Sequence, residues 1–418
     1  MHHLALRPQP LGIFPLPAGY LVLPAVPDAE AALAELLQGR VPTTLPAAWH
    51  FFALAVQGDH DAARNALAGD PSPEARYNWF VLTGDPAVYA QLATECTGDL
   101  TVLLDLVAYT LGLRDLPPDP DLVQAEVRAS ALMARAAYTL EQGQPEAAEA
   151  ELDAAINAAQ PVSPLLAAQL RLTLADTRLS QFGPDPLAIQ HYREAIRLLS
   201  GSGLTENHAH ANLNLGMLYQ ELARSQRGPL LEAAKCYQAA LRTFTRASHP
   251  ELYALAQNNL ALAYLAMPLT EASDQLRMGI AVQALREALT VYTQADYPEY
   301  WASAQLNLAN ALQYLPSAHP ADNLAEAVQL YEALLAVRDP ETDPLAYGRV
   351  LANQGNALAH LGIFTHARPK LQEAARLFAA NGDHEAAASV RELLSEIERS
   401  VAAQKEEQRD GGVPAPTV

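Results

Sequence analysis

The chain has 418 residues, of which 50% are hydrophobic and 18% charged, and its 47 acidic against 27 basic residues give a net charge of −20 at pH 7. This apolar content excludes general disorder. The acidic excess disfavours sequence-independent nucleic-acid binding and favours a partner of neutral or basic character. No apolar run is long enough to cross a bilayer and no secretory pattern is present, so the sequence predicts a cytoplasmic protein with no membrane partner.

Residues 1–40 are predicted to form a proline-rich N-terminal cap. Six prolines fall within the first thirty residues. The apolar stretches 12–14 and 20–23 flank a Pro-Ala-Gly sequence, which is typical either of a short β-hairpin or of an extended cap.

After about residue 28 the sequence predicts a long array of short amphipathic helices. Alanine and leucine dominate, apolar residues recur three and four apart, and glycine or proline interrupts the pattern every 12 to 20 residues. Residues 41–124 are expected to form divergent helical hairpins and 125–403 more regular repeats, with a disordered tail over 404–418. Two matching segments, at Gly58-Asp59 and Gly382-Asp383, read as turns in which an acidic residue begins the next helix.

The repeats have a first helix and a second helix with distinct patterns. Second helices carry a small residue, a large one four later, and usually a small one three after that, because a small side chain lets two helices approach while the large one fills the space between repeats. These triplets are Ala188/Tyr192/Ala195, Ala233/Tyr237/Ala240, Ala281/Leu285/Ala288, Ala327/Tyr331/Leu334 and Ala367/Leu371/Ala374. Four first helices share an asparagine, at intervals of 45, 48 and 46 residues: Asn214, Asn259, Asn307 and Asn353. Three of them are preceded by a proline suited to a first helical turn, at Pro250, Pro298 and Pro344.

These patterns resemble the tetratricopeptide repeat family, whose unit is a helix–turn–helix of 34 residues. The family's first helix reads close to Asn-Leu-Gly-Asn-Ala-Tyr, and residues 307–312 differ from this at two positions. The resemblance implies an all-α, right-handed superhelical solenoid. Three repeats are longer than the family's unit. The preference for arginine over lysine and the abundance of alanine indicate a bacterial source with a GC-rich genome.

The resemblance also implies that the shared asparagine faces a concave groove, together with the residues four positions before it and three and seven positions after it on the same helix face. A carboxamide can donate to and accept from the backbone of an extended peptide. The alternative is that each asparagine satisfies neighbouring groups of the protein itself, and the sequence leaves both open. The candidate peptide-binding residues are Asn214, Met217, Asn259, Asn307, Asn310, Tyr314, Arg349, Asn353 and Asn356.

No motif for catalysis, phosphate binding or metal binding is present in the sequence. Cys96 and Cys236 lack metal-site spacing and are expected to be buried thiols. We therefore expect a non-catalytic scaffold or adaptor without cofactor or metal, which binds a peptide segment of another protein and no nucleic acid. The alternatives are a regulatory sensor of a small signalling peptide, a self-assembling structural protein and a divergent enzyme. The sequence does not predict an oligomeric state.

Overall fold

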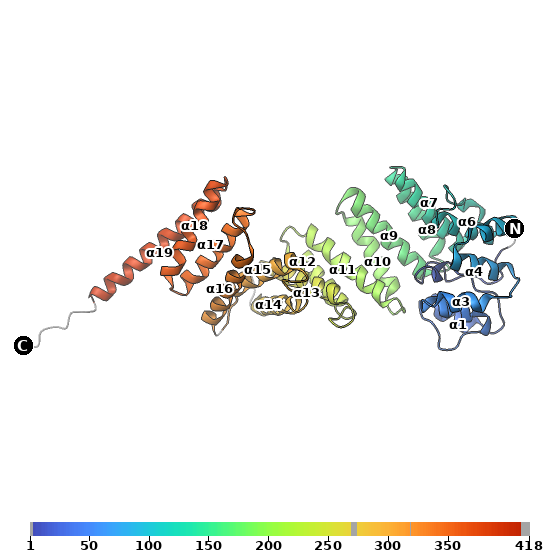
Figure 1. Cartoon of the computed structure of the whole chain (residues 1–418), viewed down its shortest axis with the longest axis horizontal. Coiled ribbons are helices and arrows are strands. Elements are labelled where there is room, and N and C mark those ends of the chain that lie inside the picture. Colours follow the sequence, from blue (N-terminus) through green and yellow to red (C-terminus); the bar gives the residue numbers. More distant parts are fainter. Residues whose placement is uncertain (1–2, 269–273, 318, 411–418) are drawn as a thin grey trace, which may run out of the picture. The chain divides into compact units, whose positions relative to one another are not determined.

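The computed structural model describes residues 3–268, 274–317 and 319–410, and every regular element within these ranges is a helix (Figure 1). The chain divides into two compact units, Met1–Leu222 and Ala223–Val418. This boundary falls inside the predicted repeat region 125–403.

The first unit begins with an irregular segment and continues as packed helices, of which α2 to α11 each contact the next in chain order. Short 3₁₀ helices lie at Ala18–Tyr20 (η1), Ala47–Trp49 (η2) and Pro120–Leu122 (η3). The α-helices are α1 (Glu30–Leu37), α2 (His50–Val56), α3 (His60–Leu67), α4 (Pro73–Thr83), α5 (Pro86–Glu95), α6 (Asp99–Thr110), α7 (Ala125–Glu141), α8 (Pro145–Ala159), α9 (Pro164–Phe182), α10 (Pro186–Leu199) and α11 (Thr205–Leu222).

The second unit is a succession of antiparallel hairpins, in which α13 packs on α14, α15 on α16, and α17 on α18. Its helices are α12 (Arg227–Ala240), α13 (Pro250–Leu265), α14 (Asp274–Leu289), α15 (Pro298–Tyr314), α16 (Pro320–Val337), α17 (Pro344–His360), α18 (Phe364–Ala380) and α19 (His384–Asp410). Prolines begin α13, α15 and α17 as the sequence predicts, because the missing N–H has no intrahelical partner at that position.

Both predicted glycine turns are confirmed. Gly58 and Gly382 have φ of +84° and +81°, a conformation that glycine adopts without steric cost. The Oδ1 atom of Asp59 accepts a hydrogen bond from the backbone N–H of Ala62 at 3.0 Å. Asp383 does the same for Ala386 at 3.1 Å, so each acidic residue caps the helix that follows.

The tail prediction is wrong in part, because α19 continues to Asp410 and residues 404–410 are helical. Lys405, Glu406, Glu407 and Gln408 are all strong helix formers, and the glycine pair that ends such a sequence comes only at 411. The rest of the predicted tail, 411–418, lies outside the described residues.

Small residues do allow close helix contacts in the repeats, most clearly where α17 meets α18. A Cβ atom added to Gly355 would lie 2.6 Å from Cγ of Leu371, which is fully buried. Any side chain at position 355 would therefore displace the buried Leu371 side chain or α18 itself.

We expect Gly355→Ala to lower the free energy of unfolding of the second unit by about 1–2 kcal/mol, because overpacking outweighs the better helix propensity of alanine. Urea unfolding followed by circular dichroism measures the effect. The matched control is Gly279→Ala inside α14, where an added Cβ meets no described atom within 4 Å. This control should gain up to about 1 kcal/mol, and a gain for both variants would contradict the packing argument.

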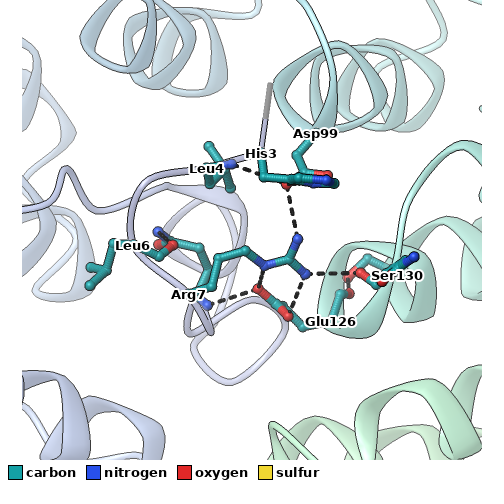
Figure 2. Close-up of polar contacts among 9 residues, drawn as sticks. His3, Leu4, Leu6, Arg7, Asp99, Glu126 and Ser130 are labelled. Atoms are coloured by element: carbon teal, nitrogen blue, oxygen red, sulfur yellow. Dashed lines mark hydrogen bonds and ion pairs between the residues drawn. The ribbon is translucent and has the colours of Figure 1, made fainter. Parts of the chain in front are cut away.

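The N-terminal segment is fastened to α6 and α7 by one arginine and two buried carboxylates (Figure 2). Arg7 Nη1 donates to Oδ2 of Asp99 at 2.9 Å, and its Nε and Nη2 donate to the two oxygens of Glu126 at 2.9 and 2.8 Å. The backbone N–H groups of Leu4 and Gln9 each donate to one of these carboxylates at 3.1 Å. Both carboxylate side chains are only 1% exposed, so they depend on these partners.

Of the two alternatives predicted for the segment near residue 20, the β-hairpin is wrong, because the backbone there pairs with side-chain amides instead of a second strand. Asn78 accepts from the N–H of Val22 and donates to its C=O, both at 2.8 Å. Gln9 likewise accepts from the N–H of Leu23 at 2.8 Å and donates to its C=O at 3.0 Å. The nearby prolines lack the N–H donors that a strand ladder needs, and residues 18–20 form η1 instead.

Candidate functional site

The predicted binding residues are divided between the two units. Asn214 and Met217 lie on α11 of the first unit, and the other seven lie on α13, α15 and α17 of the second. The structure brings Asn310, Asn353 and Asn356 together in one hydrogen-bonded network, and it places Asn307, Asn310 and Tyr314 around one hollow.

A buried tyrosine lies at the centre of the network between α15, α16 and α17. The Tyr331 hydroxyl donates to Oδ1 of Asn310 at 2.7 Å, and Nδ2 of Asn353 donates to the same oxygen at 2.9 Å. Gln313 donates to the Tyr331 hydroxyl and accepts from Nδ2 of Asn356 at 3.1 Å. Burial raises the pKa of Tyr331, so its hydroxyl remains a donor. We call this arrangement the Tyr331 bridge.

The first unit contains an equivalent arrangement, the Tyr192 bridge, between α9, α10 and α11. The hydroxyl of the buried Tyr192 donates to Oδ1 of Asp176 and is also hydrogen-bonded to the side chain of Asn214. Burial raises the pKa of Asp176, an effect that the Tyr192 hydrogen bond opposes. Beside the bridge lies a hollow of about 450 Å³ whose lining includes Met217 and the carboxylates of Asp176 and Glu221.

The step between α13, α14 and α15 lacks such a bridge. In the repeat pattern Leu285 occupies the position of Tyr192 and Tyr331, and Leu262 occupies that of Asp176 and Asn310. Leu285 is fully buried and has no hydroxyl to offer. As a result, the side chain of Asn307 makes no hydrogen bond to any residue that the structure describes, whereas its counterparts Asn214 and Asn353 are bonded.

Asn307 opens onto a hollow of about 450 Å³, here called the Asn307 hollow. Its walls are mainly apolar and aromatic. Tyr314 is 63% exposed, and the hydroxyl of Tyr264 is held by a hydrogen bond from Nε2 of Gln238 at 2.9 Å. The lining residues are Leu262, Tyr264, Leu265, Ala266, Met278, Asn307, Asn310, Ala311 and Tyr314.

Asn259 and Arg349 lie outside this hollow. Asn259 is half-buried on α13, and its Oδ1 accepts a long hydrogen bond of 3.4 Å from Asn258. Arg349 is exposed on α17 and forms no ion pair with a described residue. Sequence reasoning missed Tyr192, Tyr331 and Leu285, which it treated only as packing residues. The signal was present, because the large position of the triplets is tyrosine in three repeats and leucine in two.

Cys96 and Cys236 are both buried thiols, as the sequence predicts. Within the described ranges, no group of three or more His, Cys, Asp or Glu side chains is arranged to hold a metal ion. Over the same part of the chain, none of the helices combines the length and the apolar character that a bilayer crossing requires.

No protein-family model matches the chain, and no curated protein is found to match it. In both units the described helices pack on their neighbours in chain order, an all-α helical-repeat architecture. Among solved structures, the chain is similar to BtubC (BKLC) from P. vanneervenii, with 20% identity and a TM-score of 0.38 over 61% of this chain and 92% of the other. A Rap protein complexed with competence and sporulation factor is 13% identical, with a TM-score of 0.33 over 85% of this chain and 99% of the other. The tetratricopeptide domain of P58(IPK) is 14% identical, with a TM-score of 0.27 over 85% and 97%.

Proposed function

We propose that the protein is a non-catalytic scaffold that binds a peptide segment of a partner protein in the Asn307 hollow. One observation carries this proposal. The amide of Asn307 has no described hydrogen-bond partner at the edge of an apolar hollow, whereas the equivalent amides of Asn214 and Asn353 are engaged within the protein.

A carboxamide can hold both polar groups of one backbone residue, because it offers an acceptor oxygen and donor hydrogens side by side. The chain contains such a contact, since Asn78 holds the N–H and C=O of Val22 at 2.8 Å each. Asn307 would hold a residue of the partner in the same way. Apolar walls and a volume of about 450 Å³ suit the insertion of one side chain beside that residue.

The other candidate residues take different parts in this proposal. Asn353 and Asn356 position α17 against α15, and Asn310 serves both the Tyr331 bridge and the wall of the hollow. Tyr314 supplies an exposed ring for the partner's apolar side chain. The remaining candidates are proposed secondary contacts: Asn214, Met217, Asn259 and Arg349.

The test starts from peptides selected on the wild-type protein out of a phage-displayed library of random 12-residue sequences. We expect Asn307→Ala to bind the selected peptide at least tenfold more weakly by calorimetry, since two hydrogen bonds are lost, with an unchanged melting temperature. The control is Asn381→Ala, which removes a hydrogen bond to the carbonyl of Leu377 at the end of α18. It should lower the melting temperature and leave the affinity within about threefold, because it lies on a different helix from the hollow.

Equal affinities of wild type and Asn307→Ala would place the site elsewhere. If the library yields no binder, peptide binding itself is wrong, and light scattering then tests the self-assembling alternative. A large compaction on peptide binding, seen by small-angle X-ray scattering, would favour the sensor alternative over a scaffold.

A further inference from the structure

We infer that Leu262 and Leu285 determine what the Asn307 hollow binds. They withhold the polar bridge that is found around Tyr192 and Tyr331, and so reserve the Asn307 amide for a peptide backbone whose neighbouring side chain is uncharged and apolar. This inference rests on the proposed function of the hollow. It adds the class of ligand and two residues that set the specificity.

Leu285 occupies a position equivalent to those of the two bridging tyrosines. Tyr192, Leu285 and Tyr331 are each the large member of a small–large–small triplet, on α10, α14 and α16. All three are fully buried. Equivalent burial at equivalent positions means that the leucine fills the same packing space but ends before the hydroxyl.

The residue that accepts the tyrosine hydroxyl in the two bridges is also replaced in this repeat. Asn310 accepts from both Tyr331 and Asn353, and Asp176 accepts from Tyr192. At the corresponding place on α13 stands Leu262, which can accept nothing. Both polar members of the bridge are therefore absent from the same step, and the asparagine is the one member that is retained.

The missing bridge removes an internal hydrogen bond that an incoming peptide would otherwise have to displace. At a bridged step a peptide must displace an internal hydrogen bond before the asparagine can hold it, so the net gain is small. Asn307 has no such bond to any described residue, and helix α15 fixes its backbone in advance. Its hydrogen bonds to a peptide therefore form without internal competition.

The lining of the Asn307 hollow determines which class of side chain can anchor the peptide. Leu262, Leu265 and Met278 line the Asn307 hollow, and no ionised side chain is among the described residues that line it. A charged anchor would lose its hydration there without gaining a partner. The hollow beside the Tyr192 bridge differs, because Asp176 and Glu221 line it. The Asn307 hollow therefore selects an apolar residue of the leucine or methionine class.

Two double variants of closely similar shape test the inference on the full chain. Leu262→Asn/Leu285→Tyr copies the Tyr331 bridge, whereas Leu262→Met/Leu285→Phe provides nearly the same bulk without its polar atoms. The peptide selected on wild type should bind the first variant at least tenfold more weakly than it binds the second. Circular dichroism and thermal unfolding check that both fold. Equal loss in both variants, or no loss in the first, would overturn the inference.

A second readout does not depend on any peptide. In protein labelled with ¹⁵N-asparagine, the side-chain amide signal of Asn307 is assigned by its loss in Asn307→Ala. Exchange of its protons with water should be slower in the bridge-copying variant than in wild type and in the apolar variant. Equal exchange in all three would show that no bridge forms with Asn307. If the double variant does not fold, Leu262→Asn alone, at a half-buried position, supplies the same acceptor and the same comparison.

Failure of the inference is distinguishable from failure of the proposed function. A wild-type protein that binds no peptide, while its Asn307 amide responds to the bridge, contradicts peptide binding only. A wild-type protein that binds tightly, with charged side chains enriched in the selected peptides, contradicts the assigned ligand class and leaves peptide binding in place.

Discussion

Replacing Arg7 by methionine is expected to lower the free energy of unfolding of the first unit by about 3–5 kcal/mol, the usual cost of removing one partner from a buried ion pair. The carboxylates of Asp99 and Glu126 would be left in the protein interior without their cation. Urea unfolding gives the free energy. Hydrogen exchange of residues 3–29, followed by mass spectrometry, shows whether the N-terminal segment detaches first.

The matched control is Arg286→Met. Arg286 also donates two hydrogen bonds to one carboxylate, that of Glu326, at 3.0 and 2.8 Å. Because these side chains are 46% and 38% exposed, water replaces the lost partner and the cost should stay under about 1 kcal/mol. Similar costs for Arg7→Met and Arg286→Met would contradict the role given to burial.

Asn78→Ala is expected to cost the first unit about 2–5 kcal/mol, because the N–H and C=O of Val22 would each lose a buried hydrogen bond. The amide proton of Val22 should become one of the fastest to exchange in the segment. Asn207→Ala serves as control, since its side chain donates to the side chain of Gln169 at 3.3 Å and holds no backbone group. Slow exchange at Val22 in Asn78→Ala would mean that other contacts hold the segment.

The repeat fold could be predicted from sequence because its causes are local. Prolines at the first helical position, glycines of positive φ in the turns, and small residues at helix contacts act within a few residues of where they stand. Gly58 and Gly382 are examples, and the structure confirms the turn that each predicts. The predicted start of the tail at residue 404 is wrong for an equally local reason, because the residues that follow it are strong helix formers.

The N-terminal segment and the site were harder to predict, because their causes lie far apart in the sequence. Arg7 meets Glu126 across 119 residues, and Val22 meets Asn78 across 56. Asn307 and Asn353 look alike in sequence. They differ because Leu262 and Leu285 stand where the next repeat has Asn310 and Tyr331. Which asparagine side chain is hydrogen-bonded within the protein therefore depends on residues tens of positions away, a dependence that the 3.6-residue periodicity of a helix does not reveal.

The hydrogen bonds from the side chains of Gln9 and Asn78 to the backbone of residues 22 and 23, here called the clamp, also protect the protein from aggregation. Tyr20, Leu21, Val22 and Leu23 form an apolar run with high strand propensity. Released from the clamp, such a run offers unpaired backbone groups to a second chain and can start cross-β association. The two carboxamides thus occupy backbone N–H and C=O groups of this run, as a neighbouring strand would at the edge of a sheet. Variants that loosen the segment should therefore be lost through aggregation before the helical repeats unfold.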